Sequence, residues 1–166
     1  MKKILSLMSV AILASASAFA GTPIQPSELP GAAQKFLDTH FTGDKVAKAE
    51  KEQTKKGYEF DVNLASGAEI EFRETGKWKE VKAAKGASVP VTLVPAAITK
   101  YVADNYAGQS IVEIARKRGG FQIELSNGTE LKLTEEAQPL TADNAQKAAK
   151  KGGKKGGKKG GKKAGK

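Results

Sequence analysis

The sequence predicts an α+β domain in which a helix followed by an antiparallel meander occurs twice, the two copies forming one sheet with both helices packed on one face. The first observation is that residues 30–43 (PGAAQKFLDTHFTG) match residues 95–108 (PAAITKYVADNYAG). The second is that residues 60–72 (FDVNLASGAEIEF) match residues 121–133 (FQIELSNGTELKL). Because a unit this short cannot bury an apolar face alone, we expect the copies to share one core.

The first matched segment of each copy has the pattern of an amphipathic helix. Pro30 and Pro95 suit the first turn, where the missing amide proton would be unpaired in any case. Apolar side chains then recur at helical spacing, and each helix is expected to end near a glycine, Gly43 or Gly108. The two apolar stripes are Ala33, Phe36, Leu37 and Phe41 in the first copy, and Ile98, Tyr101, Val102 and Tyr106 in the second.

The second matched segment of each copy changes to a period of two, which is typical of half-buried antiparallel strands. The dipeptides 66–67 (SG) and 127–128 (NG) lie between paired strands and indicate hairpin turns, with positive φ expected at both central residues of the Asn-Gly turn. The offset between the copies is 65 residues at the helices and 61 at the strands. We therefore expect about four extra residues in the loop of the first copy around Lys55, Lys56 and Gly57.

The two ends of the chain differ in character from this domain. Residues 1–20 have a basic start, a short apolar stretch and a final Ala-Phe-Ala, the pattern of a secretory signal peptide cleaved near Ala20. The sequence thus predicts a signal peptide (1–20), a folded domain (21–140, with repeats at about 29–85 and 92–136) and a disordered Lys/Gly-rich tail (141–166). A periplasmic or secreted location follows, and the absence of cysteine excludes disulfides.

Positive charge is concentrated in the tail. The chain has a formal net charge of +10, but residues 141–166 hold ten lysines and one acid, whereas residues 21–140 hold 16 basic and 17 acidic side chains. Flexible lysines without arginine or aromatic residues predict sequence-independent binding to polyanions. The polyanion-binding candidates are Lys147, Lys150, Lys151, Lys154, Lys155, Lys158, Lys159, Lys162, Lys163 and Lys166. The alternative is a solubilising spacer.

The segments LPGAAQKFLDTHF, YEFDVNLASGAEIEF, GKWKEV, VPAAITKYVADNY and GFQIELSNGTELKL together resemble the PepSY-like family of exported, β-lactamase-inhibitor-like domains. The resemblance covers residues 29 to about 140. It implies a tandem α-then-β arrangement similar to the β-lactamase inhibitory protein, and export to the periplasm. The family provides no established catalytic residues to carry over to this chain.

No residue pattern predicts an enzyme, a metal site or a cofactor. His40 is the only histidine and no cysteine exists to join it, so a surface or helix-capping histidine is expected. Glu59, Asp61, Glu69 and Glu71 alternate with apolar residues, which places them on the solvent face of the sheet. There, solvated carboxylates with ordinary pKa values are favoured over a two-carboxylate acid/base site.

Two functions remain from the sequence. The first is a non-enzymatic, exported binding module of the cell envelope, held by its tail against an anionic surface such as lipopolysaccharide, acidic glycan or anionic lipid. The second is an inhibitor-like domain that sequesters another exported protein through the sheet face of Glu59, Asp61, Glu69 and Glu71, with Trp78 as either a core residue or an interface anchor. A third possibility is that the tail itself covers this acidic face.

Overall fold

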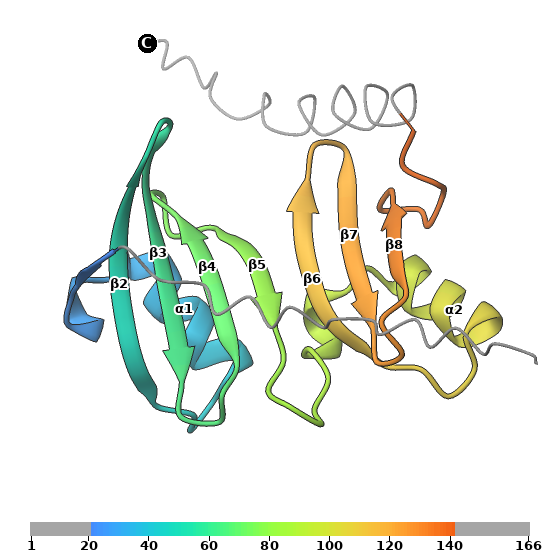
Figure 1. The fold of residues 1–166 in the computed structure, drawn as a ribbon, viewed down its shortest axis with the longest axis horizontal. Coiled ribbons are helices and arrows are strands. Elements are labelled where there is room, and N and C mark those ends of the chain that lie inside the picture. Colours follow the sequence, from blue (N-terminus) through green and yellow to red (C-terminus); the bar gives the residue numbers. More distant parts are fainter. Residues whose placement is uncertain (1–20, 142–166) are drawn as a thin grey trace, which may run out of the picture.

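The computed structural model describes residues 21–141. The predicted signal peptide and almost all of the predicted tail therefore lie outside the described residues. Within them, eight strands form one antiparallel sheet in the order of the sequence, β1 to β8, and two helices pack behind it (Figure 1). This confirms the predicted fold class of two helix-then-meander units in one sheet.

Each repeat contributes one helix and the strands that follow it. The first contains α1 (Gly31–His40), β2 (Val46–Thr54), β3 (Gly57–Leu64), β4 (Glu69–Arg73) and β5 (Trp78–Lys82). The second contains α2 (Ala96–Asn105), β6 (Ile111–Lys117), β7 (Gly120–Leu125) and β8 (Glu130–Leu133). A short strand β1 (Thr22–Pro23) and a 3₁₀ turn η1 (Pro26–Glu28) precede α1, and a second 3₁₀ turn η2 (Val91–Leu93) precedes α2.

Both helices begin directly after the predicted prolines and bury the predicted stripes. Pro30 and Pro95 are the residues that cap the helix starts, and Gly43 and Gly108 follow the helix ends with φ of 83° and 78°. The innermost side chains of the stripes, such as Ala33 and Ile98, are fully buried. The aromatic side chains of the stripes are partly buried against the same core.

The two halves form one continuous core. Strands β5 and β6 join them through the pairs Glu80–Ala115, Val81–Ile114 and Lys82–Glu113. Phe72, Val81 and Ile114 have no exposed surface and belong to one buried cluster that includes residues of both helices. Since cross-strand partners point to the same side of a sheet, the core residues lie on the helix side. The side chains between them lie on the opposite side, called here the open face.

Two local details differ from the sequence expectations. The four extra residues of the first repeat lie in its strands and not in a longer loop. Strands β2 and β3 are each two residues longer than β6 and β7. The β2–β3 hairpin and the β6–β7 hairpin are each closed by a two-residue loop, between Thr54 and Gly57 in the first and between Lys117 and Gly120 in the second. In the Asn-Gly turn only Gly128 has a positive φ. The Leu125 amide donates to the Thr129 carbonyl oxygen, so three residues form the loop, and a loop of this length needs positive φ only at its last residue.

Candidate functional site

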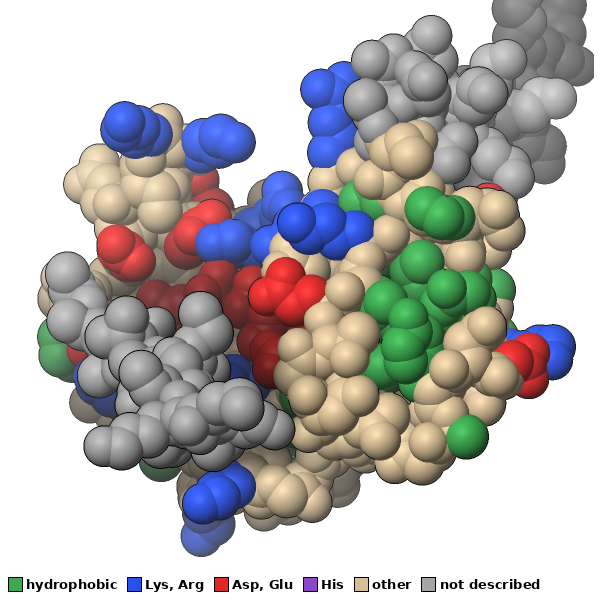
Figure 2. Space-filling model, turned by 45° about the vertical axis from the view of Figure 1, so that its right-hand side comes forward, with side chains coloured by type: hydrophobic (Ala, Val, Ile, Leu, Met, Phe, Trp, Pro, Cys, Tyr) green, Lys and Arg blue, Asp and Glu red, His purple; other side chains and the backbone are tan. Residues whose placement is uncertain are grey.

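The open face carries an acidic hollow over strands β2 to β6. Asp61 on β3 lies between Glu50 on β2 and Glu71 on β4 in the register of the sheet, so three carboxylates stand side by side. Figure 2 shows acidic side chains gathered in this hollow, with lysine and arginine side chains above it. The predicted placement of Glu59, Asp61, Glu69 and Glu71 on one face agrees with this register.

The acidic hollow has a volume of about 260 Å³ and draws its residues from five strands. Seven of its side chains are carboxylates and two are lysines, so its formal charge is strongly negative. The lining residues are Glu52, Glu59, Asp61, Val62, Asn63, Glu69, Ile70, Glu71, Lys79, Glu80, Lys82 and Glu113.

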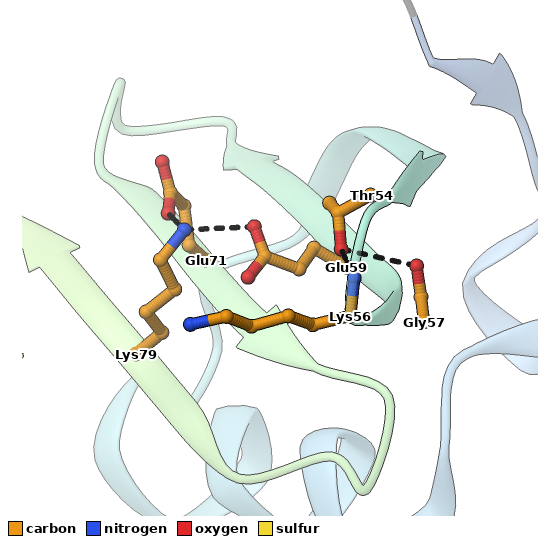
Figure 3. Close-up of polar contacts among 6 residues, drawn as sticks. All are labelled: Thr54, Lys56, Gly57, Glu59, Glu71 and Lys79. Atoms are coloured by element: carbon orange, nitrogen blue, oxygen red, sulfur yellow. Dashed lines mark hydrogen bonds and ion pairs between the residues drawn. The ribbon is translucent and has the colours of Figure 1, made fainter.

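Lys79 neutralises part of this charge by binding two carboxylates at once. Its Nζ lies 2.7 Å from Glu59 Oε2 and 2.8 Å from Glu71 Oε2 (Figure 3). Burial by itself would lower the pKa of Lys79, but the hydrogen bonds to Glu59 and Glu71 outweigh it and raise the pKa above its ordinary value. The ammonium group therefore stays charged and holds β3, β4 and β5 together on this face.

A β-bulge brings Lys79 to the open face. Glu71 pairs with Glu80, but the next residue of β4, Phe72, pairs with Trp78, so Lys79 is the extra residue of β5. The bulge reverses the alternation at this point of the strand. Without it, Trp78 and Val81 could not both point into the core, as they do.

Asp61 is the most perturbed carboxyl group of the acidic hollow. Only 8% of the residue is exposed, although it lies on the open face. Its pKa is raised to about 6, first because burial disfavours the charged form, and then because of repulsion from Glu71, Glu52 and Glu59, which Lys79 only partly offsets. The expectation of ordinary, solvated carboxylates was therefore wrong for Asp61, since its side chain is buried and lies between Glu50 and Glu71 in the sheet.

Two further carboxyl groups of the acidic hollow show the same effect. Burial and repulsion from Glu71 raise the pKa of Glu80, while Lys117 opposes the rise. Burial and repulsion from Glu80 and Glu124 raise the pKa of Glu113. In all three carboxyl groups burial is the largest cause of the raised pKa, and repulsion between neighbouring carboxylates adds to it.

Trp78 is not part of the open face, and its burial decides between the core and interface positions that the sequence left open. It lies on the helix side with 7% of its surface exposed, next to Phe36 and stacked on Phe121. The guanidinium carbon of Arg116 lies 4.1 Å from the centre of its ring system. The bulge in β5 is the physical reason, because it turns the indole toward the core.

The remaining predicted site residues are placed as follows. His40 lies at the end of α1, with Nδ1 3.0 Å from Thr92 Oγ1 and its ring against Phe36. The ten lysines of the polyanion-binding prediction lie outside the described residues. Within residues 21–141, no group of three or more histidine, cysteine or acidic side chains is arranged to hold a metal ion. In that same part of the chain, no helix is long and apolar enough to cross a membrane.

The sequence pattern indicated four of the lining acids but not Glu52, Glu80 and Glu113. A signal for Glu80 and Glu113 was present in the sequence. Glu80 directly precedes the buried Val81 and Glu113 directly precedes the buried Ile114, and neighbouring residues of a strand point to opposite faces. Glu52 could not be found in this way, since β2 reads VAKAEKEQT and has few residues of high strand propensity.

Solved structures of three proteins share this fold. A putative periplasmic protein from Bacteroides vulgatus is 39% identical, covering 75% of this chain and 97% of that one, with a TM-score of 0.68. A putative calcium-regulated periplasmic protein from Bacteroides thetaiotaomicron is 38% identical, covering 72% and 94%, with a TM-score of 0.67. A putative periplasmic protein of unknown function from B. vulgatus is 37% identical, covering 70% and 93%, with a TM-score of 0.66.

A comparison with functionally curated proteins gave no match. A family model described as "Putative beta-lactamase-inhibitor-like, PepSY-like" matches residues 19–63 and 58–140, which together span the whole described domain. The resemblance inferred from the sequence is thereby confirmed, and the chain belongs to the PepSY-like family.

Proposed function

We propose that this protein is a non-enzymatic binding module that acts in the periplasm and holds a basic segment of another exported protein against its open face. The observation that carries the proposal is the acidic hollow, which is lined by seven carboxylates and only two lysines. The periplasmic descriptions of the related structures support the location, and the inhibitor-like description of the family supports a protein partner.

The raised pKa values explain why a cationic partner fits this face. Asp61, Glu80 and Glu113 are held among like charges that the described lysines only partly neutralise. Lysine or arginine side chains entering the acidic hollow would relieve that repulsion, and part of the binding free energy would come from this relief. The crowding of the carboxylates raises the pKa of several groups that are spread over a broad surface. This spread favours binding over acid/base catalysis.

The composition of the face also sets the expected binding behaviour. Trp78 is buried on the other side, so the hollow lacks the large aromatic anchor that often dominates tight interfaces. Electrostatic attraction between partly exposed charges chiefly raises the association rate and weakens with salt. We therefore expect fast, moderate-affinity binding that decreases steeply as ionic strength rises.

A basic peptide tests this function. A fluorescein-labelled peptide of alternating lysine and alanine is titrated with the mature chain, and its anisotropy is followed at low and high salt. The double variant E52Q/E69Q removes two charges that line the acidic hollow. It should weaken binding about thirtyfold, because each of the two lost charge pairs at contact distance is worth about 1 kcal/mol in water, and about 1.4 kcal/mol corresponds to a factor of ten.

The matched control removes two exposed charges outside the acidic hollow, in the variant D38N/E135Q. It should bind the peptide like the wild type. Equal losses in both double variants, or no loss in either, would show that the open face does not select the peptide. Because one related protein is described as calcium-regulated, Ca²⁺ is added in a parallel titration, where it should compete with the peptide more strongly than sodium does at equal ionic strength.

The lysine-rich tail favours a second candidate function, which is attachment to an anionic surface. Residues 141–166 hold ten of the 28 basic side chains of the chain. The test is co-sedimentation of the mature chain, with and without residues 147–166, on anionic and neutral vesicles. Salt-sensitive binding to anionic vesicles that requires these residues supports the function, and equal sedimentation of both chains contradicts it.

A further inference from the structure

Glu50 on β2 is a buried carboxylate whose hydrogen bonding is incomplete. Only 4% of the residue is exposed. Its Oε1 lies 2.9 Å from the Nζ of Lys48, whereas its Oε2 is buried and has no hydrogen-bond partner among the described residues. A buried carboxylate oxygen without a donor is costly, since it has lost water and gained nothing in return. The site therefore calls for a further donor.

The main chain at Gly21 passes directly over this side chain. Strand β1 pairs with β2 so that Thr22 lies opposite Lys51 and Pro23 opposite Glu50. A Cβ atom built on Gly21 would lie 3.0 Å from Glu50 Cβ and 3.3 Å from the carbonyl oxygen of Lys51. The missing side chain of Gly21 is what permits this approach. The Gly21 nitrogen is two bonds from that Cβ position, and the Glu50 carboxylate oxygens are three bonds from their own Cβ, so side-chain rotation can bring them together.

The sequence adds that Gly21 is the predicted first residue of the mature chain. Hydrolysis of the Ala20–Gly21 peptide bond consumes one water molecule. It leaves a carboxylate on Ala20 of the released peptide and an amino group on Gly21, which takes up a proton at neutral pH. The Gly21 nitrogen thereby changes from a neutral amide with one N–H to an ammonium group with three.

We propose that the ammonium group of Gly21, which exists only after signal removal, binds the carboxylate of Glu50 and fastens β1 to the edge of the sheet. A hydrogen bond between two charged groups is roughly twice as strong as a neutral one. Signal cleavage then does more than release the domain, because it supplies the donor that Glu50 lacks. The inference is independent of the proposed partner binding.

The charged surroundings of Glu50 are few and defined. On its own strand, Lys48 and Glu52 share the open face, and on β3 the facing residue is Asp61. Residues 21–24 (GTPI) bring no titratable side chain. Glu50 therefore has two carboxylates and one lysine as charged neighbours, and this excess of negative charge would favour the charged form of an ammonium group bound to Glu50.

The first experiment measures where the mature chain begins and how its amino group titrates. The precursor is exported and its product weighed by intact mass spectrometry, which must give a chain starting at Gly21. The amino group is then labelled by reductive ¹³C-methylation and titrated by NMR. Its pKa should lie about one unit above the ordinary α-amino value, and should fall back to that value in E50Q.

The matched control is E52Q, which removes the same charge from the same strand and face, two residues away. Because Glu52 is also near this site, the α-amino pKa should fall in E52Q by clearly less than in E50Q, and equal falls in both variants contradict the proposal. A mature chain that starts elsewhere, or an α-amino pKa that is the same in the wild type and E50Q, overturns the proposal.

A second measurement does not depend on the folding of E50Q. A chain that retains Ala20 keeps Glu50 but moves its amino group one residue away. At pH 6 its Tm should be lower by about 4 °C, the shift expected for the loss of one good ion pair. Because the paired amino group has a raised pKa, the difference should disappear as the pH rises through that pKa, above about pH 9. Equal Tm values at pH 6 contradict the proposal.

Discussion

Replacing Asp61 with asparagine should make the protein more stable at neutral pH. Asparagine has nearly the same shape as aspartate but carries no charge. In the folded protein, burial and repulsion from Glu71, Glu52 and Glu59 all disfavour the charged form of Asp61, and Lys79 compensates only in part. The D61N variant removes this penalty while it keeps the packing of the acidic hollow.

The size of the effect follows from the change in pKa. The pKa of Asp61 rises from 3.8 to about 6 on folding, and one unit corresponds to about 1.4 kcal/mol. The charged carboxyl group therefore costs the folded state up to about 3 kcal/mol at pH 7. Because the folded-state pKa is raised, the stability that Asp61 contributes is fully present below about pH 3.8 and is lost as the pH rises through about 6. The advantage of D61N should thus be present at pH 7 and absent at pH 3.5.

Urea unfolding between pH 3.5 and pH 8 measures this dependence. Trp78 is the only tryptophan and is buried, so its fluorescence reports unfolding. The control is E69Q, which removes a charge from a half-buried residue of the same face and should change the free energy of unfolding by less than about 0.5 kcal/mol. A D61N advantage of equal size at pH 3.5 and pH 7, or a loss of stability at pH 7, would refute the reasoning. D61N should also bind the basic peptide less tightly, which would show that the unfavourable charge serves binding.

Three other substitutions test the construction of the site and of its scaffold. K79M removes the ammonium group between Glu59 and Glu71. The free energy of unfolding in urea should fall by about 1 kcal/mol, whereas the basic peptide should bind more tightly in the anisotropy titration. G76A places a Cβ 2.9 Å from the amide nitrogen of Ala33 at a φ of 75°, and it should lower the free energy of unfolding by about 3 kcal/mol. Its control G67A has a φ of 93° with open space around it, and it should lower the free energy of unfolding by about 1 kcal/mol in the same assay. F72A empties a fully buried position and should lower the free energy of unfolding by about 3–5 kcal/mol, measured with urea.

Features that depend on residues close together in the chain could be predicted from the sequence alone. The helical spacing of the two apolar stripes and the prolines before them predicted both helices, which begin directly after those prolines. Strict alternation predicted β3 and β4 and placed Glu59, Asp61, Glu69 and Glu71 on one face. The internal match predicted that the meander occurs twice. These signals are local, because the side-chain period of a helix or strand is fixed by backbone geometry alone.

The sequence was less informative where the strand signal is weak or interrupted. Strand β2 is built mainly of alanine, lysine and glutamate and was not predicted as a separate strand, although it supplies Glu50 and Glu52. In β5, Trp78 and Val81 break the alternation, and the sequence left the place of the indole open. The pairing of Phe72 with Trp78 decides it, because the bulge belongs to two strands together.

How the charges of the open face act on one another follows only from the way the strands are arranged in the folded domain. Neither the raised pKa of Asp61 nor the double contact of Lys79 can be obtained from one strand, since the first depends on residues of four strands and the second on residues of three. Likewise, the approach of Gly21 to Glu50 joins positions 29 residues apart in the sequence. The physical reason is that alternation fixes which side of a sheet a residue faces, whereas register, bulges and curvature fix what it meets there.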